Sequence, residues 1–147
     1  MSATQAKPLR IGEVAELLGT TPRTIRYYEE IGLLPAADDR AQGKHRVYTQ
    51  ADVDRVREIM RLRDLLGLTL DEISALLEAE DARAQLRREI QQTEDPDEIR
   101  RILEQALGHI GNQLDLVRRR RRELDQLESE LVAKRRAIHR RIGELAP

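Results

Sequence analysis

The chain has 147 residues, no cysteine and a formal net charge of −1, with 36% charged and 2% aromatic residues. The missing cysteines exclude disulfides, thiolate nucleophiles and Cys-based zinc sites, and no apolar stretch reaches the roughly 20 residues that cross a bilayer. These features predict a soluble, cytoplasmic protein rich in exposed helix, in which any DNA binding must come from the placement of charges and not from their number.

The first helix is predicted after a disordered leader at residues 1–8. In "IGEVAELLG", apolar residues recur at i, i+3, i+4 and i+7 from Ile11, which is the period of one helix face. Gly19 follows the last of them and is placed to end the helix.

A second helix is predicted immediately afterwards, in "TTPRTIRYYEEIG". Thr21 can cap it, Pro22 suits its first position, and Gly32 closes it. Two short helices joined by a few residues are the outline of a helix-turn-helix, which also occurs in proteins that bind no DNA.

The second helix carries the strongest candidates for contact with nucleic acid. On a helix that begins at Pro22, Arg23, Arg26 and Tyr27 share a face, with Thr24 nearby. Arginine offers paired donors to phosphate or guanine, and a tyrosine hydroxyl can donate to phosphate. The alternative is that these arginines pair with the glutamates that end the helix. Tyr28 has the phase of the buried side, so a DNA contact and a core position are both open.

A small hairpin, or wing, is predicted between this helix and residue 49. The segment before it is rich in Pro, Gly and Asp, and residues 46–48 are β-prone. Basic side chains on such a wing would hold phosphates beside the recognition helix, although a basic loop alone is usually only solvated. The candidates are Arg40, Lys44, His45, Arg46 and Tyr48.

Two further helices are predicted from paired capping residues. Thr49 with Asp52 opens the first, which ends near Gly67, and Thr69 with Glu72 opens the second. The polar tract from residue 78 to residue 93 is predicted to be helical in part.

A long helix is predicted from "DPDE", a strong start signal at residues 95–98, to residue 145. It would measure about 70 Å at 1.5 Å per residue. Apolar residues recur in it every seven positions, which is typical of a coiled-coil seam. Beyond residue 118 the helix could pair with another chain or fold back as a hairpin. The predicted dimerisation residues are Leu103, Ile110, Val117, Leu124, Leu131 and Ile138.

Together these stretches resemble the MerR family of bacterial transcription regulators. The resemblance rests on "LRIGEVAELLGTTPRTIRYYEEIGLL", "GKHRVY" and "TQADVDRVREIMRLRDLLGLTLDEISALL", followed by the long terminal helix. It is close over about residues 9–78.

The resemblance implies an all-α fold with a small β wing. A winged helix-turn-helix head at 9–78 would be followed by a helical linker at 79–96 and a coiled-coil dimerisation helix at 97–147. The homodimer would bind a near-palindromic promoter site and distort the spacer between the elements that RNA polymerase recognises. Transferred to this chain, the contacts of the recognition helix fall on Arg23, Thr24, Arg26 and Tyr27, and those of the wing on Arg46 and its neighbours, with Tyr48 bracing the wing.

The chain departs from the family pattern in ways that bear on its signal. The wing looks longer and more acidic than usual, and His45 stands where a tyrosine is common. Metal-sensing members of the family share cysteines at the start of the long helix and just beyond it. Redox-sensing members also require cysteines, and this chain has none. Drug-sensing members carry an additional domain with aromatic walls, whereas this chain has no aromatic residue after Tyr48. We therefore expect no metal site and no cofactor.

Two other classes of function compete with this one. The heptads could make the chain a helical scaffold or adaptor for a protein partner. An enzyme is disfavoured, because the many carboxylates fall on faces predicted to be exposed, with no catalytic or metal-ligand constellation around them.

Overall fold

The computed structural model describes residues 7–35 and 46–147. The chain divides into two compact units, Met1–Glu78 and Ala79–Pro147. In the part of the chain that is described, no helix is long and apolar enough to span a membrane.

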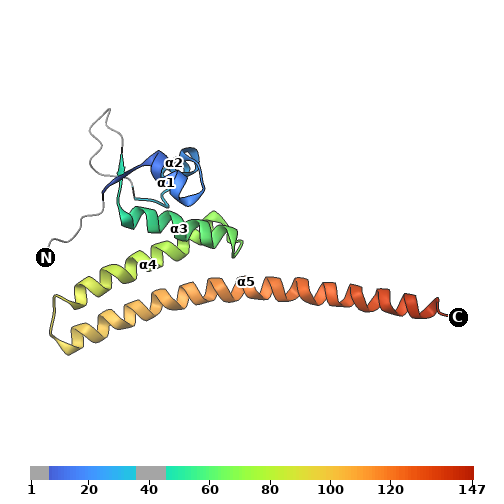
Figure 1. The fold of residues 1–147 in the computed structure, drawn as a ribbon. Coiled ribbons are helices and arrows are strands. Elements are labelled where there is room, and N and C mark those ends of the chain that lie inside the picture. Colours follow the sequence, from blue (N-terminus) through green and yellow to red (C-terminus); the bar gives the residue numbers. More distant parts are fainter. Residues whose placement is uncertain (1–6, 36–45) are drawn as a thin grey trace. The chain divides into compact units, whose positions relative to one another are not determined.

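The first unit begins with the two short helices that the sequence predicts (Figure 1). Helix α1 (Ile11–Leu18) ends at Gly19, whose φ of 68° is left-handed, a conformation that suits glycine. Helix α2 (Pro22–Glu30) begins at Thr21, whose hydroxyl accepts a hydrogen bond from the backbone N–H of Thr24. The predicted end of α1 at Gly19 and the predicted start of α2 at Thr21 are both confirmed.

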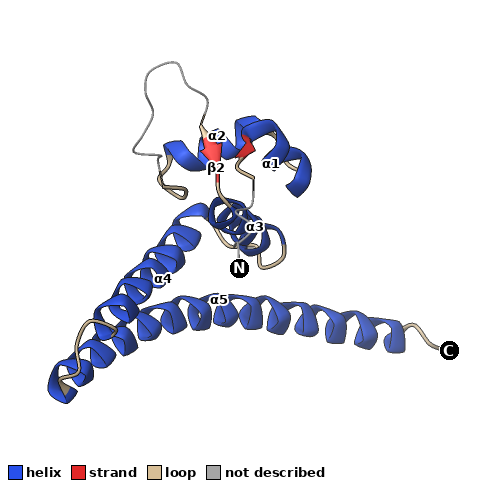
Figure 2. Cartoon of the chain, turned by 60° about the vertical axis from the view of Figure 1, so that its left-hand side comes forward, coloured by secondary structure: helices blue, strands red, loops and turns tan. Residues whose placement is uncertain are grey.

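The two strands pair in a way that the sequence did not indicate. Strand β2 (Val47–Tyr48) is antiparallel to β1 (Leu9–Arg10), which directly precedes α1 (Figure 2). The pairing sets Leu9 opposite Tyr48. The rest of the predicted hairpin falls largely on residues 36–45, which lie outside the described residues. The sheet therefore links the start of the head to the far end of the wing segment.

Helix α3 (Gln50–Asp64) begins with a complete capping box between Thr49 and Asp52, as predicted. Its apolar residues join those of α1, α2 and β2 in one core. The fully buried side chains of this unit are Val14, Ile25, Tyr28, Leu33, Leu34, Tyr48, Val53, Val56, Ile59 and Ile73.

Helix α4 (Leu70–Ile90) starts at the predicted Thr69–Glu72 capping pair. It continues through the polar tract, which is helical almost throughout and not only in part. After a short turn, helix α5 (Pro96–Glu144) runs unbroken for 49 residues, so the chain does not fold back beyond residue 118.

The start of α5 is capped, but not by a complete capping box. Asp95 caps the helix by accepting the N–H of Asp97 at 3.0 Å, but Glu98 does not return a bond to Asp95. Its carboxylate instead accepts the hydroxyl of Thr93 at 2.7 Å. The hydroxyl of Thr93 in turn accepts the N–H of Asp95 at 3.3 Å, so Thr93 bridges Asp95 and Glu98.

We expect the Thr49→Ala variant to destabilise the head by about 1 kcal/mol, because it removes the acceptor for the N–H of Asp52. Urea unfolding followed by tyrosine fluorescence measures this in the first unit alone, because the chain has three tyrosines, Tyr27, Tyr28 and Tyr48, and no tryptophan. Gln50→Ala, one position along, is the control and should change the midpoint much less. Equal effects of the two changes would contradict the capping role.

Candidate nucleic-acid interface

Helix α2 presents one polar face to solvent. Arg23, Arg26 and Tyr27 are exposed, and Thr24 beside them is half-buried. The opposite side of the helix carries Ile25, which is fully buried in the core. Because apolar burial fixes the rotation of a helix about its own axis, the polar face must point outward. The predicted grouping of these four residues is therefore found in the structure, while their contact with DNA stays a prediction.

The two arginines of this face are not held by other side chains in the part of the chain that the structure describes. In residues 7–35 and 46–147, neither Arg23 nor Arg26 forms an ion pair or a side-chain hydrogen bond. The alternative in which they pair with the glutamates at the end of the helix is not what the described residues show. Glu29 instead lies against Arg46, with 3.0 Å between its Oε1 and Nη1 of the arginine.

A groove of about 640 Å³ runs beside this face. Its lining includes Arg63 from α3, which was not among the residues predicted from the sequence, because nothing in the local pattern of α3 links it to α2. Three guanidinium groups and one carboxylate, that of Glu30, thus border one groove, and the excess of positive charge favours an anionic occupant. The lining residues are Arg23, Thr24, Arg26, Tyr27, Tyr28, Glu30, Arg63 and Leu70.

Tyr28 lies in the core, with only 1% of its surface exposed. Its hydroxyl accepts a hydrogen bond from Nη1 of Arg63, and the guanidinium lies 5.8 Å from the ring centre. Arg63 also pairs with Asp64 at 2.8 Å. This placement favours a structural role for Tyr28, which orients Arg63 at the groove. A direct contact of Tyr28 with DNA remains only a sequence prediction.

Burial raises the pKa of Tyr28 above its usual value of 10.0, and the nearby positive charge of Arg63 opposes that shift only in part. The protonated hydroxyl is therefore the form that suits the folded state.

Two of the predicted wing residues, Arg46 and Tyr48, have side chains that are largely removed from solvent. The side chain of Arg46 is only 5% exposed and lies between Glu29 and Asp52, and Tyr48 is 1% exposed. The contact of Arg46 with DNA therefore stays a prediction, and in the structure its side chain lies against two carboxylates. The other wing candidates, Arg40, Lys44 and His45, lie outside the described residues.

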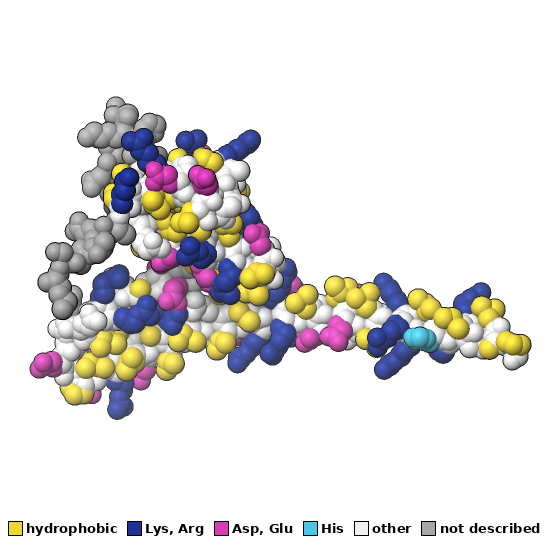
Figure 3. All heavy atoms as spheres, viewed as in Figure 1, with side chains coloured by type: hydrophobic (Ala, Val, Ile, Leu, Met, Phe, Trp, Pro, Cys, Tyr) yellow, Lys and Arg dark blue, Asp and Glu magenta, His cyan; other side chains and the backbone are white. Residues whose placement is uncertain are grey.

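Helix α5 exposes most of its predicted seam. Figure 3 shows apolar side chains following this helix up to its C-terminal end, between Lys and Arg side chains. Five of the six predicted dimerisation residues are at least half exposed, and Ile110 is half-buried. The five are Leu103, Val117, Leu124, Leu131 and Ile138.

The described residues show no cluster of side chains that could serve as metal ligands. Among them, no three His, Asp or Glu side chains are grouped so that they could bind a metal ion.

The helix pair, the two-stranded sheet and the outward arginine face define a DNA-binding head of the winged helix-turn-helix class. The sequence pattern of the "MerR HTH family regulatory protein" matches residues 9–80. The chain is 30% identical to the HTH-type transcriptional regulator YfmP of Bacillus subtilis over 123 residues, which cover 84% of this chain and 87% of YfmP.

A second relative is the mercuric resistance operon regulatory protein of Bacillus cereus, 47% identical over 46% of this chain and 50% of that protein. The chain also covers only 31% of the nodulation protein NolA of Bradyrhizobium elkanii, so it spans half or less of both relatives. Among solved structures, that of the lead(II)-bound regulator PbrR691 from Ralstonia metallidurans CH34 is 32% identical and covers 87% of this chain and 86% of that chain. Its TM-score is 0.45.

The chain belongs to the MerR family of DNA-binding transcriptional regulators, as the match along nearly the whole length of YfmP shows. This confirms the resemblance seen in the sequence.

We expect stability to fall as the pH rises above about 10, where a tyrosine in the unfolded chain loses its proton while folded Tyr28 keeps its own. The contribution of Tyr28 is thus fully present below its unfolded pKa and is lost as the pH passes the raised folded pKa. Unfolding midpoints measured at several alkaline pH values check this. The Tyr28→Phe variant, which has no such proton, should lose less stability over the same range; an identical pH profile would contradict the assignment.

Proposed function

We propose that this protein is a homodimeric regulator that binds a near-palindromic promoter site through α2 of each protomer. The observation that carries the proposal is the outward face of α2, where two arginines lie without an ion-pair partner among the described residues. The net charge is only −1, so the placement of these cations, and not the overall charge, would attract DNA.

The groove beside α2 supports a specific geometry for this contact. A recognition helix in the major groove uses residues near its N-terminus to reach base edges, and Arg23, Thr24 and Arg26 lie in the first half of α2. Arginine pairs with the two acceptors of guanine or with phosphate oxygens. Arg63 lines the same groove, where its positive charge, which Asp64 offsets in part, would add to the attraction for the phosphates of DNA.

The seam of α5 supports self-association. Leucine and valine side chains that are half exposed every seven residues would bury their surface in a paired helix. We propose that the long helices of two protomers form an antiparallel coiled coil. This pairing would set the distance between the two recognition helices, which must match the helical repeat of DNA.

The regulatory step that we propose is distortion of the promoter spacer, which would act on RNA polymerase through the DNA and without catalysis by this protein. Such a regulator would work in the cytoplasm. Cysteine-based sensing has no residues here, since the chain contains none, and no aromatic residue follows Tyr48 to wall a pocket in the tail. Occupancy of the promoter site would then be controlled either by a small apolar ligand or by the abundance of the protein itself.

A scaffold or adaptor is the second candidate, and the exposed apolar stripe of α5 is the observation that favours it. The two candidates differ in whether the head binds DNA. Selection of bound genomic fragments by the wild-type protein, followed by gel shift on the recovered promoter, separates them. Absence of any specific fragment would favour the adaptor.

We expect Arg26→Ala to weaken binding to the recovered promoter fragment by roughly tenfold or more, since a good arginine contact is worth about 1–3 kcal/mol. If Arg26 binds a phosphate, its removal should reduce the slope of log affinity against log salt by about one in each protomer, and hence by about two per dimer. Arg57→Ala is the control, because this exposed arginine on α3 pairs with Asp54. Unchanged affinity with an unchanged circular dichroism spectrum would overturn the assignment of Arg26.

We expect the double variant Leu124→Lys/Leu131→Lys to be monomeric, because two charges per helix would have to be buried in the seam. Gln126→Lys/Ala133→Lys adds the same charge one heptad apart on the opposite side of α5, and it should remain a dimer. Light scattering measures the mass of both. A dimer in the first variant would place the contact elsewhere.

A further inference from the structure

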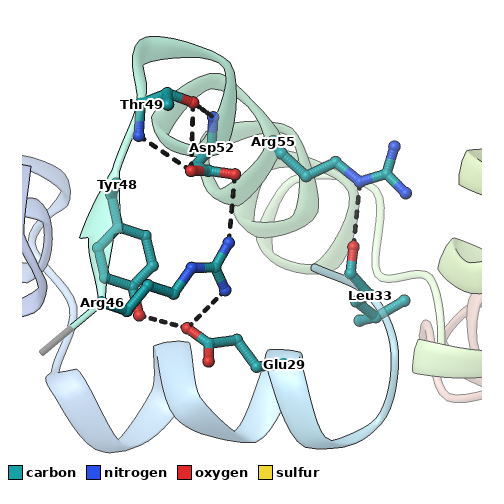
Figure 4. A network of polar contacts seen from close by, with 7 residues as sticks. All are labelled: Glu29, Leu33, Arg46, Tyr48, Thr49, Asp52 and Arg55. Atoms are coloured by element: carbon teal, nitrogen blue, oxygen red, sulfur yellow. Dashed lines mark hydrogen bonds and ion pairs between the residues drawn. The ribbon is translucent and has the colours of Figure 1, made fainter. Parts of the chain in front are cut away.

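A single arginine joins three elements of the head (Figure 4). Nη1 of Arg46 lies 3.0 Å from Oε1 of Glu29 in the last turn of α2, and Nη2 lies 3.4 Å from Oδ1 of Asp52 in the first turn of α3. The guanidinium stands 4.6 Å from the ring centre of Tyr48 in β2. Nη2 donates a hydrogen bond to Asp52, Nη1 is within ion-pair distance of Glu29 without forming a hydrogen bond, and one face of the guanidinium lies against the ring of Tyr48.

The partners of Arg46 are themselves fixed. The hydroxyl of Tyr48 donates to the same Oε1 of Glu29. Asp52 uses its second oxygen, Oδ2, to accept the backbone N–H of Thr49 at 2.9 Å, so the cap of α3 and the ion pair share one carboxylate. A movement of any member of this set would break a contact in another element.

The set is also largely removed from water. The side chains of Arg46, Glu29 and Asp52 are 5%, 9% and 16% exposed. Removing one member of such a buried group leaves an uncompensated charge in the interior, which costs more than the loss of a surface pair. A guanidinium held in this way cannot turn outward to a phosphate without abandoning two carboxylates.

We infer that Arg46 is a positioning residue, which locks the end of the recognition helix to β2 and α3, and that it does not contact DNA. This inference rests on the proposed function, because what it positions is the DNA-binding face of α2. Arg23 and Arg26 lie on the same helix as Glu29. A shift of α2 at its Glu29 end therefore displaces both arginines from the groove of the duplex.

The two possible roles of Arg46 predict opposite effects of a change at Glu29. If Arg46 contacts phosphate, Glu29→Gln removes a negative charge and a competitor for the guanidinium, so binding to DNA should tighten or stay the same. If Arg46 positions α2, Glu29→Gln loosens the lock and binding should weaken, although the protein has become less negative. Whether Glu29→Gln tightens or weakens binding to DNA therefore shows whether Arg46 contacts phosphate or positions α2.

The experiment measures the affinity of the full-length protein for the promoter fragment recovered with the wild type, at a temperature well below every unfolding midpoint. We expect Glu29→Gln and Arg46→Met each to weaken binding by about tenfold, equal to about 1.4 kcal/mol. The double variant should be no weaker than the worse single variant, because both changes break the same lock. Arg46→Lys should also weaken binding, since one ammonium group cannot match the planar fork that bridges two carboxylates.

Glu16→Gln is the matched control, because it makes the same charge change at an exposed position on α1 and should not weaken binding. Unchanged or tighter binding by Glu29→Gln, or additive losses in the double variant, would overturn the inference. If the variants have lower unfolding midpoints but unchanged affinity for DNA, the contacts of Arg46 serve stability alone, and the inference is also overturned. Should Arg46→Met fail to fold, the sign of the Glu29→Gln effect still decides. A wild-type protein that selects no DNA would instead refute the proposed function on which the inference rests.

Discussion

The burial of Ile25 and Tyr28, on the inner side of α2, is the constraint on which the rest of the head depends. Both side chains are enclosed by the core, with at most 1% of their surface exposed. Because a helix is a rigid element, burying one side determines where every other side chain points. Arg23, Arg26 and Tyr27 are exposed for this reason. The apolar contacts that stabilise the head thus also orient its polar face.

Polar contacts restrain the movements of α2 that the apolar core does not prevent. Burial of one stripe fixes the rotation of a helix about its axis but restrains less well its sliding and tilt. The contacts of Arg46 with Glu29 and Asp52 tie the end of α2 to α3, and the bond from Nε of Arg55 to the carbonyl oxygen of Leu33 at 3.1 Å ties the segment after α2 to α3 (Figure 4). Directional contacts of this kind favour one arrangement over its close neighbours.

In the second unit, apolar side chains of α5 are exposed to solvent, whereas those of the head are buried. Leu124, Leu131 and Ile138 are each more than half exposed in the single chain. A row of such side chains at heptad spacing is stabilised when a second helix covers it. The proposed dimer therefore gives the long helix its missing partner and supplies the second DNA-binding head at the same time.

The sequence by itself determined where the helices begin, because the capping signals are local. Thr21, Thr49 and Asp95 cap through groups two or three residues away, and the period of α5 is visible in its own residues. The family, too, was evident from motifs within the head. Only the tertiary structure paired β1 with β2, brought Arg63 to the groove of α2, and buried Arg46 between two helices. Each of these joins residues far apart in the chain, and a basic side chain looks the same in sequence whether it will meet a phosphate or a buried carboxylate.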